Sequence, residues 1–242
     1  MYSNLMGEFL GTMVLIIFGC GAVANVSLKK SKAEGSGWIV IATGWACGVI
    51  LGIFMAEATG APQADINPAV TLAKYFIGIY GSLEAVITML FQVGGAFFGA
   101  FLITLFYGQH WRLTDDPAVK LGVFCTSPAV RNWLNALFCE VMSTVLLIIA
   151  VFAIFAKLDG YLASHYGPYL VGILVWGIGL SLGGTTGYAI NPARDLGPRL
   201  AHAILPIPGK GGSDWSYAWI PVAGPLTGGV IAFGLAKLFG LV

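Results

Sequence analysis

Charged residues are scarce in this sequence: they make up 10% of the 242 residues, and the formal net charge is only +1. A soluble domain usually carries about a quarter charged residues. The composition therefore excludes an ordinary soluble enzyme and a disordered chain. The nearly neutral charge balance also excludes the clustered basic surface on which nucleic-acid binding depends. We therefore expect no nucleic-acid partner.

Groups for catalysis and metal binding are equally few. The chain has three histidines and four cysteines, and no group of His, Cys and Asp shows the spacing of a metal site. Three of the four cysteines fall in apolar stretches, which argues against a disulfide framework. No nucleophile stands with a base in a recognisable motif. We expect no metal, no cofactor and no enzymatic activity.

The sequence is rich instead in hydrophobic residues, at 57%, and in glycine, at 34 residues. Uncharged stretches cover 9–28, 35–56, 85–111, 141–156, 160–193 and 215–236. Because about 20 apolar residues cross a bilayer as a helix, these stretches predict a polytopic all-α membrane protein. We expect six spanning helices at roughly 6–26, 38–57, 83–107, 134–155, 168–182 and 219–241.

Three motifs recur in the same order in the two halves of the chain, which indicates a duplication. They are Glu-x-x-x-Thr at 8–12 and 140–144, Asn-Pro-Ala at 67–69 and 191–193, and Gly-x-x-x-Gly at 95–99 and 224–228. Each half holds three predicted spans, and an odd number of spans inverts the second copy relative to the first. We therefore predict a single transmembrane domain over 1–242, with inverted repeats at approximately 1–110 and 132–242.

The two boxes, Asn67-Pro68-Ala69 and Asn191-Pro192-Ala193, each predict the start of a short helix. Asn is a favoured N-cap, and Pro is favoured at the first helical position. As helices, the segments 67–77 and 191–201 are each about 16 Å long, so two placed end to end cover about one bilayer core. In an inverted repeat they enter from opposite faces and meet at their N-termini. The helix dipoles there would repel cations, and the free amide groups of both Asn side chains would donate to neutral solutes.

With these motifs the sequence resembles the major intrinsic proteins, the aquaporin and glycerol-facilitator family, over nearly its whole length. The resemblance implies an aquaporin-like fold with six spanning helices and two re-entrant half-helices, and a passive channel that excludes ions and protons. It also implies that Glu8 and Glu140 are buried and hold the re-entrant loops by hydrogen bonds, since an unpartnered carboxylate inside a membrane is costly. An ion pair of Asp195 and Arg199 would brace the second loop.

The same resemblance assigns the narrowest part of the channel to four residues, namely Trp45, Gly179, Tyr188 and Arg194. Water-selective members carry a His where Gly179 stands, so Gly179 is expected to leave room for a larger solute. The rings of Trp45 and Tyr188 would face the CH side of a three-carbon polyol, and Arg194 would face its hydroxyls. Further residues are expected to line the pore with carbonyl or apolar groups: Val49, Gln63, Ala64, Asp65, Ile66, Gly187, Ala189 and Ile190.

Two residues depart from the family pattern. Asp65 stands near one mouth of the pore where the family usually has a His. It is expected to be either a solvated loop acid or a group that acts in gating or in proton-linked permeation. Tyr188 replaces the Phe of the best-known glycerol facilitators, and its hydroxyl would make the filter tighter and more polar.

The predicted function is therefore a passive transmembrane channel for small uncharged solutes, with glycerol-like polyols first and water second. The open alternatives are a channel mainly for protonated lactic acid, urea or hydrogen peroxide, and a water-selective aquaporin. A secondary transporter also uses inverted repeats and broken helices, but it would have few acids for ion coupling. The expected partners are a small neutral solute and the lipid bilayer. The resemblance implies a homotetramer in the plasma or inner membrane.

Two signals disagree on orientation. The resemblance implies that both termini are cytoplasmic, whereas the positive-inside rule favours the side with more cations, which here is the opposite side. We adopt the orientation of the family. The cations of the predicted outer side are Lys29, Lys30, Lys32, Arg112, Lys120, Arg131 and Lys210, and those of the inner side are Lys74, Lys157 and Lys237.

Overall fold

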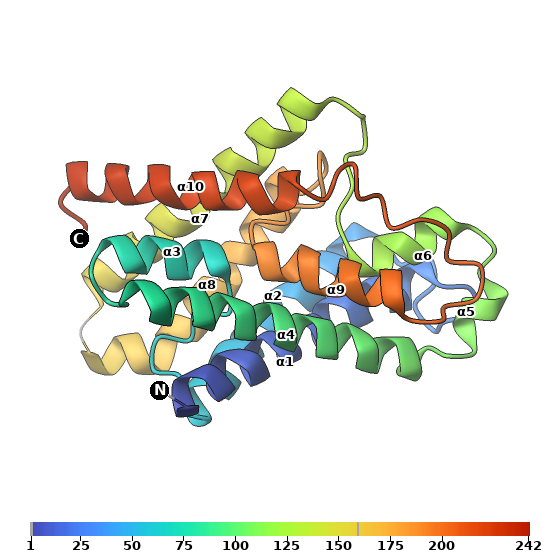
Figure 1. Cartoon of the computed structure of the whole chain (residues 1–242), viewed down its shortest axis with the longest axis horizontal. Coiled ribbons are helices and arrows are strands. Elements are labelled where there is room, and N and C mark those ends of the chain that lie inside the picture. The colour runs from blue at the N-terminus through green and yellow to red at the C-terminus, as the bar shows by residue number, and fades with distance from the viewer. Residues whose placement is uncertain (1, 159) are drawn as a thin grey trace.

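The computed structural model describes residues 2–158 and 160–242, and over these residues the fold is all-helical (Figure 1). Six of the described helices are long and apolar enough to cross a membrane. The prediction of an all-α membrane protein with six spanning helices is therefore confirmed. These helices are α1 (Tyr2–Ser27), α2 (Trp38–Ala58), α4 (Ser82–Phe106), α7 (Trp133–Lys157), α8 (Gly160–Leu182) and α10 (Ile220–Leu238).

Two shorter helices, α3 (Pro68–Phe76) and α9 (Pro192–Ile204), begin at the two Asn-Pro-Ala boxes. In Figure 1 they follow one another along the long axis of the molecule, with the spanning helices around them. Helix α3 packs against α10, and α9 packs against α4, so each half-helix contacts the last span of the other half. The exact repeat boundaries, 1–110 and 132–242, stay a prediction.

The recurring glycine pairs explain why the spanning helices approach so closely. A Cβ added at Gly95 would lie 2.1 Å from the carbonyl oxygen of Phe9, and one at Gly99 would lie 2.6 Å from that of Met13. The second pair packs against α7 in the same way: a Cβ at Gly228 would lie 2.7 Å from the Val141 carbonyl oxygen. Small residues at this spacing let membrane helices pack backbone to backbone.

The observed elements differ from the predicted ones in two places. Helix α8 begins at Gly160 and passes through Pro168, which was predicted to start the span. A proline is tolerated inside a membrane helix where neighbours satisfy the freed carbonyl. The region between α4 and α7 was not predicted to be helical, but it holds α5 (His110–Leu113) and α6 (Pro117–Phe124). Both lie at the right end of Figure 1, whereas the two termini lie in its left half.

Candidate functional site

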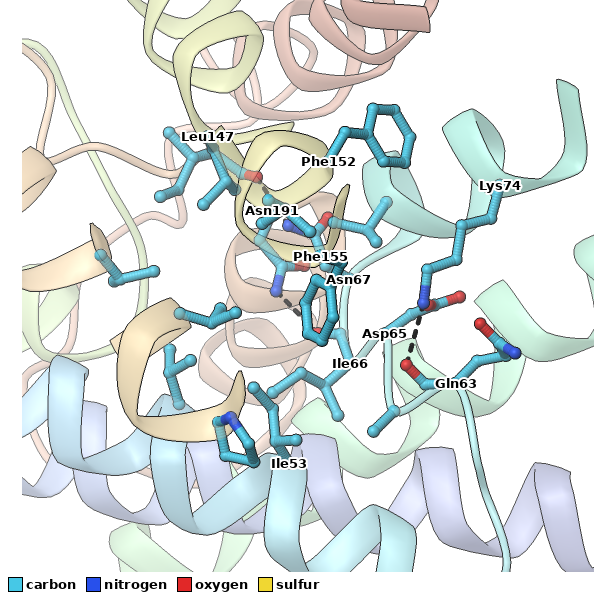
Figure 2. Close-up of a pocket in the computed structure, with 18 of the residues that line it drawn as sticks. Ile53, Gln63, Asp65, Ile66, Asn67, Lys74, Leu147, Phe152, Phe155 and Asn191 are labelled. Atoms are coloured by element: carbon cyan, nitrogen blue, oxygen red, sulfur yellow. Dashed lines mark hydrogen bonds and ion pairs between the residues drawn. The ribbon is translucent and has the colours of Figure 1, made fainter. Parts of the chain in front are cut away.

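The two half-helices meet through a reciprocal pair of hydrogen bonds. The side-chain oxygen of Asn67 accepts from the Ala69 amide at 2.9 Å, and its Nδ2 donates to the Ile190 carbonyl at 2.8 Å. Asn191 likewise caps its own helix, and its Nδ2 donates to the Ile66 carbonyl at 2.8 Å (Figure 2). Both amide groups were expected to be free. In fact one of the two hydrogens on each nitrogen joins the loops, and only the other is left over.

A buried glutamate supports the loop in front of each box. Glu8 accepts from the backbone amides of Asp65 and Ile66 at 2.8 and 2.7 Å, and also from Gln92 at 2.8 Å. Its side chain is completely buried. A carboxylate in such a place is tolerable because charge-assisted hydrogen bonds occupy its oxygens.

Glu140 makes the matching contacts in the second half. It accepts from the amides of Ala189 and Ile190 at 3.0 and 2.9 Å and from the Thr186 hydroxyl at 2.7 Å. The two amides precede Asn191 by two residues and one, as those of Asp65 and Ile66 precede Asn67. The two loops are therefore held by the same set of main-chain contacts.

The same symmetry extends to backbone strain. Ala64 and Ile66 have φ of 43° and 45°, and Tyr188 and Ile190 have φ of 39° and 44°. For residues other than glycine, this left-handed conformation costs about 1–2 kcal/mol. Such strain persists only where surrounding contacts fix the backbone, and here the two glutamates supply those contacts.

A cavity of about 510 Å³ runs along both loops and both half-helix N-termini. Most of the predicted site residues line it, and the rest of its wall is largely apolar. Figure 2 shows part of this wall. The predicted residues on the lining are Trp45, Val49, Gln63, Ala64, Asp65, Ile66, Asn67, Tyr188, Ala189, Ile190, Asn191 and Arg194.

Arg194, Trp45 and Tyr188 all line the cavity, and the first two are in contact. The guanidinium carbon of Arg194 lies 3.9 Å from the centre of the Trp45 ring, close enough for a cation–π contact. The indole nitrogen of Trp45 and the hydroxyl of Tyr188 are buried without a hydrogen-bond partner among the described residues. The guanidinium of Arg194 makes no hydrogen bond within the described part of the chain either. The guanidinium therefore has unused hydrogen-bonding capacity on this wall, whereas the two unpartnered atoms of Trp45 and Tyr188 are buried behind it.

Gly179 and Gly187 are not among the residues that line the cavity, in contrast to the prediction. A Cβ at Gly179 would lie 2.8 Å from Cζ of Tyr188, so the space beside this glycine holds the tyrosine ring. Trp38, which was not predicted, donates from its indole nitrogen to the Gly179 carbonyl at 2.8 Å and meets the Tyr188 ring edge-on. Gly187, with φ of 85°, faces Thr126 instead.

Asp195 and Arg199 form an ion pair at 2.8 Å within α9, and both side chains are completely buried. The pair ties α9 to two segments outside it. Asp195 accepts from the amide and hydroxyl of Thr126, both at 2.7 Å, and Arg199 donates to the carbonyls of Thr126 and Ser213, both at 2.8 Å. Neither residue lines the cavity, so their contacts are with the protein.

The prediction that Asp65 is a solvated loop acid is wrong. Its side chain is fully buried, and one oxygen accepts from the hydroxyls of Thr71 and Tyr80, both at 2.8 Å. The other oxygen lies 2.5 Å from Nζ of Lys74. The carboxylate is thus held in place by three partners on α3 and the turn that follows it.

Lys74 and Gln92 bind the first loop and its bracing glutamate, and neither residue was predicted to do so. Gln92 is a polar residue inside an apolar span, which is itself a signal for a buried partner; its Nε2 donates to both Glu8 and Thr71. Lys74 follows Asn67 by seven residues, two turns along the half-helix, and this spacing could have placed it beside the loop. No group of acids, histidines and cysteines in the described residues could hold a metal ion.

Comparison with known proteins identifies the family of this chain. The model of the major intrinsic protein family matches residues 1–235. The chain belongs to this family. The resemblance seen in the sequence is thereby confirmed, and the chain is a multi-pass membrane protein.

Two relatives of this major intrinsic protein cover almost all of it. A probable glycerol uptake facilitator protein of Thermotoga maritima is 54% identical over 233 residues, which are 96% of this chain and 97% of the relative. The glycerol uptake facilitator protein of Bacillus subtilis is 50% identical over 92% of this chain and 80% of its own length. The crystal structure of the aquaglyceroporin from Plasmodium falciparum superposes with a TM-score of 0.82 at 26% identity, covering 98% of this chain and 95% of that one.

Proposed function

We propose that this chain is a passive channel for small uncharged solutes, with glycerol-like polyols and water as its permeants. The observation that carries the proposal is the wall formed by Trp45, Tyr188 and Arg194. It combines the aromatic surfaces of Trp45 and Tyr188 with the guanidinium of Arg194, which lies against the Trp45 ring and makes no hydrogen bond within the described residues. A polyol has an apolar CH side and a polar hydroxyl side, and it can satisfy both kinds of surface at once.

Ion exclusion in this proposal comes from fixed positive charge. Two helix N-termini, at Asn67 and Asn191, meet in the cavity, and each carries about half a positive charge. Arg194 adds a full charge on the lining. A cation or hydronium in the cavity would lose its hydration shell and meet this positive field, whereas a neutral solute would not be repelled by it. We assign the chain no enzymatic activity.

The backbone carbonyls of the two loops supply hydrogen-bond acceptors for the hydroxyl groups of a solute. Ile66 and Ile190 each use one lone pair of the carbonyl oxygen for an Asn amide, and a carbonyl oxygen has two. We propose that these groups and the neighbouring lining residues 63–66 and 189–190 replace part of the hydration of a solute as it moves through. The names of the relatives support glycerol as the first solute to test.

The arrangement in the cell is also a proposal. We infer a homotetramer with one pore in each subunit, in the plasma membrane, with the Lys74 end of the cavity toward the cytoplasm. The whole chain, 1–242, would then be one channel unit. Cross-linking or native mass spectrometry of the purified protein would test the tetramer independently of transport.

The proposal can be tested by stopped-flow light scattering on proteoliposomes, challenged in turn with glycerol and with impermeant sucrose. We expect shrinkage followed by fast re-swelling in glycerol only, without electrical conductance. Arg194→Ala, checked for folding, should lower glycerol permeability by about tenfold, since it removes the charged donor of the wall. Arg112→Ala removes the same residue type from outside the cavity and should leave the flux unchanged.

Three results would contradict the proposal in different ways. Fast water flux without glycerol entry would indicate a water-selective channel. Flux that follows a proton or sodium gradient would indicate a secondary transporter. No flux of any solute would exclude a constitutively open channel.

A further inference from the structure

The two half-helices carry cations at different places along the same face. Arg194 is the third residue after Asn191, and the third residue after Asn67 is Val70. Lys74 lies four residues beyond Val70, one turn further along α3 on the same face. Val70 and Lys74 both line the cavity, as Arg194 does in the other half. Each half of the cavity therefore has one cation on its wall.

The ammonium group of Lys74 is oriented by two fixed acceptors. Nζ lies 2.5 Å from Oδ1 of Asp65 and donates to the Gln63 carbonyl at 2.9 Å. Figure 2 shows the side chain reaching from α3 toward these two residues. An ammonium has three hydrogens, so one hydrogen is left without a partner among the described residues.

The exposure of the pair is asymmetric. The Lys74 side chain is 14% exposed, whereas that of Asp65 is fully buried. Both residues line the cavity, but only the Lys74 side chain keeps an exposed part, so the lysine is the member of the pair that a solute can reach. Because Asp65 balances the charge, Lys74 offers a donor to a solute without adding net charge at this position.

The surrounding wall is mostly apolar, with Ile53, Ile77, Ile79 and Phe155 among its residues. A solute that enters there loses water contacts, and its oxygens need donors from the protein. The loop residues near Lys74 contribute carbonyl acceptors, so the ammonium supplies the complementary group. Its use of the Gln63 carbonyl also replaces one acceptor on this wall by a donor.

We propose that Lys74 is a second solute-binding donor, which binds a hydroxyl oxygen of a permeating polyol in the half of the channel remote from Arg194. The inference rests on the proposed function and adds a binding position to it. A polyol would then bind Lys74 and Arg194 one after the other as it moves along the cavity, with the two Asn side chains between these positions.

The test measures glycerol and water permeability of the same proteoliposomes for four variants. Lys74→Met removes the ammonium, and Asp65→Asn/Lys74→Met removes it without leaving a buried charge. Lys74→Arg keeps a donor, and Lys237→Met changes a lysine away from the cavity. We expect the first two to lower glycerol permeability about three- to tenfold, the loss of one hydrogen bond of ordinary net strength. Water permeability should change less than glycerol permeability, and the other two variants should resemble the wild type.

The double variant decides the question if the single variant does not fold, because the amide that it introduces at position 65 can still accept from Thr71 and Tyr80 through its oxygen. An equal loss of glycerol and water permeability would overturn the inference and assign Lys74 a structural role. Unchanged glycerol permeability would overturn it too. Failure of the wild-type protein to conduct glycerol would instead refute the proposed function, so the two failures are distinct.

Discussion

The two re-entrant loops are alike in their main-chain contacts and differ in the ion pairs beside them. Before each box, a buried glutamate accepts two consecutive backbone amides, and the residues three and one before the Asn have positive φ. Each Asn then donates to the opposite loop. This shared part fixes the position of the two helix N-termini, which is what the centre of a channel requires.

The ion pairs are where the loops differ. In the second half, Asp195 and Arg199 both lie on α9 and contact only protein groups. In the first half, Asp65 lies in the loop itself, and its partner Lys74 reaches the cavity. The comparison separates two uses of a buried charge pair: one joins a half-helix to outer segments, and the other holds a loop while it presents a donor to the cavity.

Breaking the fully buried pair should have the largest effect. Arg199→Met leaves Asp195 uncompensated and removes the contacts with Thr126 and Ser213, which should cost about 3–5 kcal/mol of stability. Asp65→Asn should cost less, because the cation that it leaves behind reaches the cavity. Thermal unfolding of both variants in the same detergent measures the difference. A larger loss of Tm for Asp65→Asn than for Arg199→Met would contradict this expectation. It would show that the exposure of the cation does not decide which ion pair contributes more to stability.

Replacing the bracing glutamates tests the part that the loops share. In Glu8→Gln and Glu140→Gln, an amide group faces backbone donors that a carboxylate accepted before, and each change should cost about 2–4 kcal/mol. We expect the two losses of Tm to be similar, since each glutamate accepts two backbone amides and one side-chain donor. Glu57→Gln, on the cavity lining and outside both loops, is the matched control. Tolerance of one change but not the other would mean that the loops are not held equally.

The recurring motifs made most of the fold and of the two loops predictable from the sequence. Helix caps and spans follow from residue type and from uncharged length, so the half-helices and five of the six span positions could be read from the sequence. The bracing roles of Glu8 and Glu140 came from the family resemblance and from the cost of an unpaired charge in a membrane. Contacts between side chains that come together only on folding could not be predicted from the sequence. Asp65 looked solvated because its partners Thr71, Lys74 and Tyr80 come together only when α3 folds back over the loop.

Gly179 shows a second limit of the sequence. A missing side chain was expected to widen the channel, but Tyr188 fills the space. The width at this position depends on the pair of residues, and their contact joins α8 to the second loop. Neither residue type alone carries that information.

The charge count on the predicted outer side includes cations whose partners could not be seen in the sequence. Three cations of the predicted outer side are bound within the protein: Lys120 by the Pro208 carbonyl, Lys210 by carbonyls at the end of α9, and Arg131 by Asp214. Burial raises the pKa of the Asp214 carboxyl, but hydrogen bonds from Arg131 and Ser216 outweigh it and keep the pKa below its usual value. The number of cations therefore overstates the free positive charge on that side.

The smallest effect is expected at the strained position that the loops share. Ala64 and Tyr188 both lie three residues before their Asn, with φ of 43° and 39°. Ala64→Gly relieves the backbone strain and loosens the unfolded chain, two opposing effects of about 1 kcal/mol each, so Tm should barely change. Tyr188→Gly makes the same change in backbone and also removes an aromatic wall of the cavity.

The difference between these two glycine variants measures what the tyrosine ring contributes. Ala64→Gly should keep the ratio of glycerol to water permeability, whereas Tyr188→Gly should lower it, because a wider and less amphipathic wall holds a polyol less well than it passes water. Equal ratios in the two variants would mean that the ring only fills the space beside Gly179. In that case the two loops would be equivalent in function at this position as well as in backbone, and selectivity would depend on other residues of the lining, such as Arg194, Trp45 and Lys74.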